Sequence, residues 1–195
     1  TDALCPDLGA AISRRPAHKV VVLDDDPTGT QTVHDVPVLT MWDAAALEAE
    51  FAADGAGFYI LTNSRSRTAA SARDLTLEIA HQLHTAAAGR SFTVISRSDS
   101  TLRGHFPIET DVLNEVLGPF DATLLVPYFE AGGRYTIDDV HYVANGDELI
   151  PAAETAFARD ASYGYANSNL REWVAEKTGG RVRPADVRSI SISEL

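Results

Sequence analysis

The sequence predicts an α/β protein: a three-layer, Rossmann-like sandwich built on a mainly parallel sheet, with a β-hairpin arm toward the C-terminal end. Four short runs rich in β-branched residues recur along the chain with helical stretches between them, which is the spacing of successive βαβ units. These runs are apolar nearly throughout rather than alternating, and this pattern indicates strands that are buried on both faces of a sheet. The runs cover residues 19–24, 58–62, 91–96 and 122–127.

Three amphipathic segments are the predicted crossover helices between these strands. In residues 68–88 apolar side chains recur at helical spacing, and Gly89 follows as a C-terminal stop. Residues 43–53 and 107–117 have the same character, the second with its apolar side chains on one face. Parallel strands require such crossover connections, so the helices and the strands support the same fold.

After residue 127 the pattern changes from βα units to a hairpin. Asn145-Gly146 is the preferred pair for a tight turn and is flanked by apolar residues, so we expect a β-hairpin arm there. The remaining predicted elements are an aromatic segment at 157–165, a helix at 169–177 with Ser168 or Asn167 as its N-cap, and a strand at 187–192.

Composition narrows the classes of function. The chain has 195 residues, of which 45% are hydrophobic, and a net charge of −12, which is unlike proteins that bind nucleic acid or anionic membranes through clustered Lys and Arg. No apolar run approaches the ~20 residues of a membrane span. Cys5 is the only cysteine, so no internal disulfide can form and a cytoplasmic protein is expected. Because the chain begins without Met and stops just after its last predicted strand, we expect a fragment of a longer protein.

Polar loops follow all four predicted strands. In an open α/β sheet, ligands bind beyond the carboxyl ends of the strands, because the loops converge there. We therefore expect the ligand site where these four loops meet. The loops lie at residues 24–30, 63–67, 96–105 and 130–134.

Five of the 14 arginines fall in these loops, although the chain is acidic overall. Guanidinium groups bind carboxylates or phosphates in bidentate fashion, and neighbouring Ser and Asp side chains bind hydroxyl groups. The pattern indicates a site for a polyhydroxy acid. In the alternative interpretation, Asp24 and Asp99 cap turns or helices and pair with the arginines as surface salt bridges. The five arginines are Arg65, Arg67, Arg97, Arg103 and Arg134.

The first loop has a D-x-D-x-T pattern at residues 24–28, directly after an apolar strand. This resembles the nucleophile motif of haloacid-dehalogenase-type phosphatases. The resemblance implies Asp24 as nucleophile, Asp26 as acid/base and a Mg²⁺ ion held in part by Asp138 and Asp139. Those enzymes also place a lysine before the late acidic pair, whereas the two lysines of this chain lie before the motif and after the pair.

Four motifs occur in the order found in the four-carbon acid sugar kinase family, which the sequence closely resembles. The resemblance continues through residues 138–142, 163–164 and 168–173, so it covers nearly the whole chain. The most specific part is the string Ser100-Thr101-Leu102-Arg103-Gly104. The four motifs are Asp25-Asp26-Pro27-Thr28-Gly29, Asn63-Ser64-Arg65, the run from Ser96 to Gly104, and Gly132-Gly133-Arg134-Tyr135-Thr136.

The resemblance implies ATP-dependent phosphorylation of the terminal hydroxyl of a four-carbon sugar acid such as threonate, erythronate or 3-oxo-tetronate, with ATP and Mg²⁺ as cofactors. Such kinases combine an N-terminal substrate domain with a C-terminal nucleotide-binding domain. Residues 1–195 resemble only the first and contain no G-x-x-x-x-G-K-[ST] loop, so we expect the chain to be inactive alone. A homodimer is a possible assembly. A stand-alone sugar-acid binding module is a further alternative.

Carried over residue by residue, the resemblance implies a site with one catalytic carboxylate and several binding groups. Asp25 is the expected catalytic residue, which orients the accepting hydroxyl or takes its proton. Arg65 is expected at the acid group of the substrate. No metal ligand is assigned. The expected substrate-binding residues are Asp25, Asp26, Arg65, Arg97, Ser98, Asp99, Ser100, Arg103 and Arg134.

Overall fold

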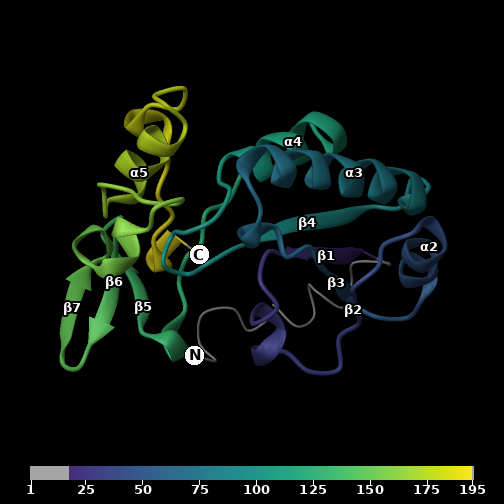
Figure 1. Ribbon diagram of the computed structural model, residues 1–195, viewed down its shortest axis with the longest axis horizontal. Coiled ribbons are helices and arrows are strands. Elements are labelled where there is room, and N and C mark those ends of the chain that lie inside the picture. The colour runs from purple at the N-terminus through teal and green to yellow at the C-terminus, as the bar shows by residue number, and fades with distance from the viewer. Residues whose placement is uncertain (1–17, 195) are drawn as a thin grey trace.

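The computed structural model describes residues 18–194 and consists of two units, which lie side by side in Figure 1. The α/β unit, residues 18–117, has a parallel sheet and three helices. The hairpin unit, residues 130–190, has an antiparallel sheet, short 3-10 turns and one helix. The predicted fold class is confirmed: an α/β protein with a mainly parallel sheet and an added hairpin.

Four parallel strands form the sheet of the α/β unit, in the order β2-β3-β1-β4. The central strand β1 (Lys19–Asp24) pairs with β3 (Gly57–Leu61) on one side and with β4 (Phe92–Arg97) on the other. The short strand β2 (Val38–Leu39), which the sequence pattern missed, adds to the far edge of β3. The first three predicted strands are therefore present within a residue of their expected bounds.

The three predicted helices are also present, α2 (Ala44–Ala52), α3 (Ala69–Ala87) and α4 (Ile108–Leu117), although only α2 and α3 connect parallel strands. The Thr68 hydroxyl caps α3 by accepting a hydrogen bond from the third residue beyond it, at 3.3 Å. At the other end Ala88 takes a left-handed conformation, with φ of 48°, just before the predicted glycine stop.

All three helices pack on one face of the sheet. For α2 and α3 the reason is topological: the steps from β2 to β3 and from β3 to β4 run in the same direction, and right-handed crossovers then fall on the same side. Helix α4, which follows β4, packs beside α3. Only the step from β1 to β2 runs the other way, and it contains a short 3-10 turn, η1 (Gly29–Thr32), instead of an α-helix. Within residues 18–194 the predicted three layers are thus two, and Ile95 on the other face is 43% exposed. The buried core contains Val21, Leu23, Phe58, Ile60, Leu47, Phe51, Ile79, Leu83 and Leu113.

Two predicted strands are wrong. Residues 122–127 form no strand, and the side chains of Leu124 and Val126 are each 75% exposed. Residues 187–192 are irregular and lead into a 3-10 turn. β-branched composition gives a segment strand propensity, but a strand also needs a partner edge, and neither segment meets one among the described residues.

The hairpin unit is built on an antiparallel sheet of β5 (Arg134–Ile137), β6 (Val140–Asn145) and β7 (Glu148–Pro151). The predicted Asn145-Gly146 turn joins the last two strands, with φ of 61° at the glycine. Helix α5 (Leu170–Lys177) follows as expected.

The N-cap of α5 is Asn169, where we had expected Ser168 or Asn167. The Asn169 side chain accepts a hydrogen bond from the Arg171 amide at 3.0 Å. The Ser168 hydroxyl instead accepts from the Ala153 amide at 2.9 Å.

No helix in the described part of the chain is long and apolar enough to cross a membrane.

The loop after β4 joins the two units. Leu102 in this loop is only 5% exposed and belongs to the core of the hairpin unit. Phe106 stacks on Trp173 of α5, with ring centroids 4.9 Å apart. A second link is an ion pair of 2.6 Å between Arg181 and Asp111 of α4. The segment 98–106 therefore starts from one core and is packed into the other.

Because Leu102 fills the hairpin core, we expect Leu102→Ala to lower the free energy of unfolding by about 3 kcal/mol, through lost burial and an unfilled cavity. Leu124→Ala is the matched control, since its exposed side chain predicts a loss below about 0.5 kcal/mol. Urea denaturation followed by circular dichroism measures both. Equal losses in the two variants would contradict this packing.

Candidate functional site

Three of the four predicted loops converge at one edge of the parallel sheet. The register places Asp24 at the end of β1 opposite Leu61 of β3 and Arg97 of β4, so the three strands end at the same level. The loops that follow, residues 25–29, 62–67 and 98–105, consequently meet there. This part of the site was predicted from the general behaviour of open α/β sheets.

Asp25 and Arg65 form a bidentate ion pair in this region. Arg65 donates from Nε and Nη2 to the two carboxylate oxygens of Asp25, at 2.9 and 2.5 Å, and from Nη1 to Asp26 at 3.2 Å. Asp25 is only 2% exposed. A bidentate pair of this kind fixes both side chains in position as well as neutralising their charges.

The pKa values of the two neighbouring carboxyl groups, Asp25 and Asp26, are shifted in opposite directions. Burial raises the pKa of Asp25 to about 6, and the nearby charges of Glu109 and Asp24 add to this, while Arg65 opposes it. The pKa of Asp26 is lowered, because the hydroxyl and amide of Thr28 donate hydrogen bonds to its carboxylate at 2.5 and 2.8 Å. A carboxylate with a pKa near neutrality is suited to accept a proton, whereas its neighbour stays ionised.

Asp24 is fully buried and pairs with Arg97, whose Nη1 donates to one carboxylate oxygen at 2.9 Å. Its second oxygen has no hydrogen-bond partner, and burial raises the pKa of this carboxyl. Gly29 lies so close that a Cβ there would be 2.1 Å from the carboxylate, so the first loop requires glycine at that position. Asp24 therefore supports the loop from within.

The phosphatase interpretation requires the late acidic residues to lie near Asp24 at the strand ends, where they could share a metal ion. Asp138 and Asp139, expected as late metal ligands, lie in the turn between β5 and β6 of the hairpin unit. Asp139 pairs there with Arg171 of α5 at 2.7 Å.

The third loop is held by its own charges. Asp99 accepts from Arg103 Nε at 2.7 Å and from the Thr101 hydroxyl. Gly104, with φ of 148°, lies against Ser98: a Cβ on this glycine would be 2.9 Å from the serine Cβ and 3.5 Å from an Asp25 oxygen. The third loop thus lies against the first.

Arg134 reaches this region from another direction than predicted. It begins β5 of the hairpin unit, not a loop after a fourth parallel strand. Its guanidinium and that of Arg103 both lie over the Phe157 ring, at 5.6 and 5.0 Å from the centroid. Its Nε is buried without a partner, and none of the ion pairs of residues 18–194 includes it. Its Nη1 donates to the Gly132 carbonyl, so the guanidinium has no carboxylate partner within residues 18–194.

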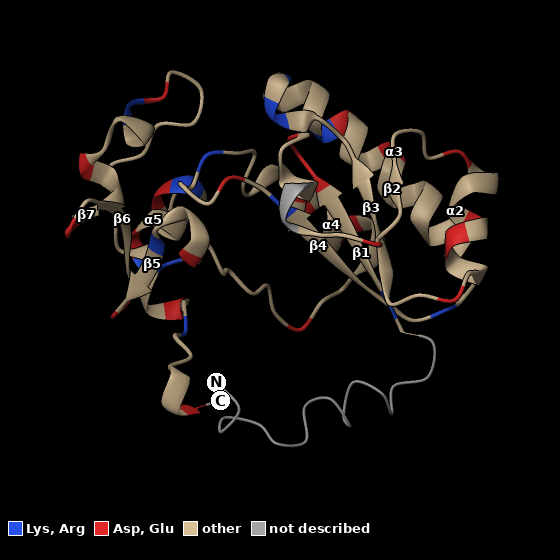
Figure 2. Ribbon diagram, turned by 90° about the horizontal axis from the view of Figure 1, so that it is seen from below, with Lys and Arg blue, Asp and Glu red and all other residues tan. Residues whose placement is uncertain are grey.

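The salt bridges of the alternative interpretation are real, but several are not at the surface. Figure 2 shows both signs of charge close together where the two units face each other. Asp24 and Asp25 are buried, and Arg65 has a side-chain exposure of 19%. Most of the predicted arginines are thus neutralised internally, and Arg67 is exposed on the surface.

The sequence analysis missed three residues that support the site. Glu109 in the first turn of α4 is 7% exposed and accepts from Ser64 at 2.6 Å and from Ser96 at 3.2 Å. Helical spacing could have revealed it, because it lies three residues before the buried Val112. His105 and Tyr163 gave no such signal, since they lie far apart in the sequence.

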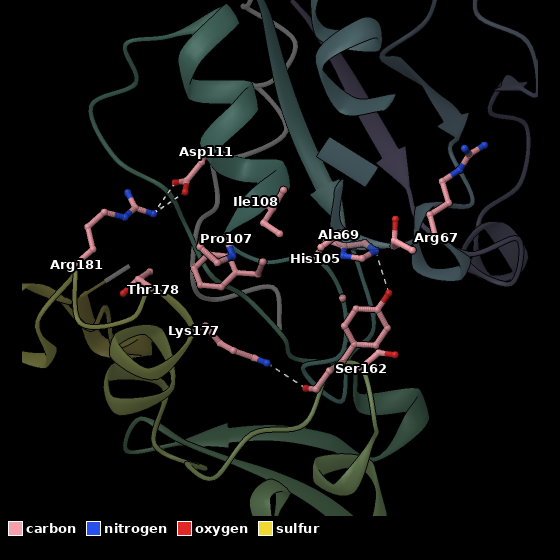
Figure 3. Close-up of a pocket in the computed structure, with 14 residues that line it drawn as sticks. Arg67, Ala69, His105, Pro107, Ile108, Asp111, Ser162, Lys177, Thr178 and Arg181 are labelled. Carbon is pink, nitrogen blue, oxygen red and sulfur yellow. Dashed lines mark hydrogen bonds and ion pairs between the residues drawn. The ribbon is translucent and has the colours of Figure 1, made fainter. Parts of the chain in front are cut away.

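A cavity of about 480 Å³ lies behind His105 and Tyr163, between the two units (Figure 3). Its basic side chains do not converge: Arg181 pairs with Asp111, and Lys177 donates to the main chain at Tyr163. None of the predicted substrate-binding residues lines it. The cavity and the predicted binding residues at the strand ends are therefore separate.

We expect one Asp carboxyl to titrate near pH 6, far above its ordinary 3.8, and to disappear from the titration in Asp25→Asn. Arg65→Gln should move this pKa higher, because Arg65 stabilises the ionised form. Arg73→Gln, at an exposed pair, should leave it unchanged. Side-chain ¹³C NMR across pH 3–8 measures the shifts, and normal acidity at Asp25 would contradict the burial argument.

Comparison with known proteins identifies the family. A family model described as a sugar-binding N-terminal domain matches residues 20–194. A comparison with curated proteins finds no match. Among solved structures, a Bordetella bronchiseptica protein with a DUF1537 domain, described with bound citrate as a domain-swapped dimer, is 26% identical over 81% of this chain and 40% of its own, with a TM-score of 0.59.

Two further structures share the fold. A Haemophilus influenzae DUF1537 protein is 20% identical over 80% of this chain and 38% of its own, with a TM-score of 0.56. A Salmonella typhimurium protein described as a putative tRNA synthase is 18% identical over 82% and 38%, with a TM-score of 0.56. The chain spans about two fifths of the length of these structures. The DUF1537 proteins are the four-carbon acid sugar kinase family, and this chain belongs to the family of their sugar-binding N-terminal domains.

Proposed function

We propose that this chain is the substrate-binding domain of an ATP-dependent kinase that phosphorylates the terminal hydroxyl of a four-carbon sugar acid. The observation that carries the proposal is the buried Asp25 carboxylate, with a pKa of about 6, clasped by Arg65. Asp25 can take the proton of an attacking hydroxyl. The neighbouring loops supply Arg side chains that suit the acid group of a substrate, and Ser and Asp side chains that suit its hydroxyl groups. The family supplies the sugar-binding role.

In the proposed reaction Asp25 orients the accepting hydroxyl and takes its proton as the phosphoryl group is transferred. Arg134, which has no carboxylate partner among the described residues, and the adjacent Arg103 bind the acid group of the substrate. Arg65 at the acid group stays a prediction, because Asp25 already occupies two of its N–H groups. Hydroxyl groups along the sugar acid bind to Asp26, Arg97, Ser98, Asp99 and Ser100.

ATP and Mg²⁺ are proposed to bind mainly to a second, nucleotide-binding domain. Within residues 18–194 no three His, Cys, Asp or Glu side chains converge into a group that could hold a metal ion. We accordingly propose that the chain has no kinase activity alone and works together with that domain in the cytoplasm. The citrate and the swapped dimer of the Bordetella protein support an acid ligand and a homodimer for this chain.

Calorimetric titration of the chain with D-threonate, L-threonate and D-erythronate tests the site. We expect saturable binding of at least one acid, and a loss of at least about tenfold in affinity for Asp99→Ala and Arg134→Gln, because each removes a charged hydrogen-bonding partner. Arg73→Gln is the matched control, an exposed arginine on α3, and should bind like the unchanged chain.

Two outcomes would contradict the proposal. Equal affinity in the Arg134 and Arg73 variants would show that binding lies elsewhere. If no acid binds, yet the chain hydrolyses a phosphate ester with Mg²⁺ and loses that activity in Asp24→Asn, the phosphatase interpretation replaces the kinase.

A further inference from the structure

We infer that the hairpin unit positions the substrate loops, by holding main-chain carbonyl groups next to the proposed binding residues. The inference deepens the proposed function and rests on it for the meaning of the site. The positioning residues are His141, Tyr163 and Tyr165. All three belong to the hairpin unit, and all three bind carbonyl groups of the α/β unit.

Three hydrogen bonds carry the argument. The Tyr163 hydroxyl donates to the Arg65 carbonyl at 2.7 Å, and the Tyr165 hydroxyl donates to the Thr101 carbonyl at 2.8 Å. His141 Nε2 donates to the Ser100 carbonyl at 2.7 Å. The partners are 41 to 98 positions apart in the sequence. The hairpin unit thus binds one carbonyl of the loop at residues 62–67. In the loop at residues 98–105 it binds two consecutive carbonyls, those of Ser100 and Thr101.

All three donors are buried: His141 is 0% exposed, Tyr163 8% and Tyr165 7%. The loss of one hydroxyl therefore removes the donor that the structure provides for a carbonyl group. The His141 ring is fixed as well, because its Nδ1 accepts from the Thr136 hydroxyl at 3.0 Å, which leaves the proton on Nε2.

The two loops need such support, because each contains a non-glycine residue in the left-handed region. Asn63 has φ of 51° and Leu102 has φ of 66°. Conformations of this kind persist where the surrounding structure holds them. The carbonyl at Arg65 lies two residues from the first of them, and the carbonyl at Thr101 is adjacent to the second.

Tyr163 also links the second loop with the end of the third. His105 Nε2 lies 2.9 Å from the Tyr163 oxygen and 3.0 Å from the Ser64 carbonyl, so its N–H is shared between them (Figure 3). The ring planes meet edge to face at 81°. Tyr163 and His105 thus hold the Arg65 and Ser64 carbonyls, one on each side of the Cα of Arg65, whose side chain binds Asp25.

Tyr163→Phe and Tyr165→Phe test the inference, because each removes one hydroxyl. The matched control is Tyr142→Phe on β6, whose hydroxyl has no hydrogen-bond partner among the described residues. Amide hydrogen exchange of the ligand-free chain should become about tenfold faster in residues 62–67 for Tyr163→Phe, and in residues 98–105 for Tyr165→Phe. Helix α3 and the control should exchange as before. In the calorimetric titration, each variant except the control should bind the sugar acid about fivefold more weakly, the equivalent of one net hydrogen bond.

Unchanged exchange in the two loops, a uniform rise over the whole chain, or equal effects in the control would each overturn the inference. Unchanged affinity in both variants would overturn it too. If the unchanged chain binds no sugar acid, the proposed function fails, and the exchange of the ligand-free protein still decides whether the hairpin unit positions the loops.

Discussion

The structure depends on one loop that leaves the α/β unit and is packed into the core of the hairpin unit. Residues 98–106 leave the end of β4, place Leu102 and Phe106 among the apolar side chains of the hairpin unit, and then begin α4. The same segment carries Asp99 and Arg103 of the candidate site. A change in the relative position of the two units would consequently move charged groups at the strand ends, so stability and site geometry are tied to the same few side chains.

The second constraint is electrostatic. Buried carboxylates are tolerated only where cations or hydrogen-bond donors compensate for their lost hydration. Here the effect of burial and the opposing effect of the arginines are close in size. Arg65 and Arg97 offset Asp25 and Asp24 without fully cancelling the effect of burial on their pKa values. This balance keeps the pKa of Asp25 near neutral pH. A fully exposed or fully paired aspartate would have a lower pKa.

How much of this could be predicted from the sequence varies with the range of the interaction. The strands ending at Asp24, Leu61 and Arg97 and helix α3 follow from local patterns, and their loops meet because parallel strands end at one edge. Residues 122–127 show the limit of that reasoning, since composition does not reveal whether a partner edge exists. The place of Arg134 and the contacts of Tyr163 depend on how a distant unit packs, and no short-range pattern encodes that packing.

The single reversed step of the sheet has a consequence for the chemistry available at the end of β1. In many nucleotide-binding sheets the first strand leads into a helix, whose N-terminal amides receive phosphate. Here a four-residue 3-10 turn stands in that place. At the end of β1 the charged groups are therefore side chains, not the amides of a helix N-terminus. Side chains can be exchanged one at a time without altering the fold, so ligand preference at these strand ends is free to diverge through single substitutions.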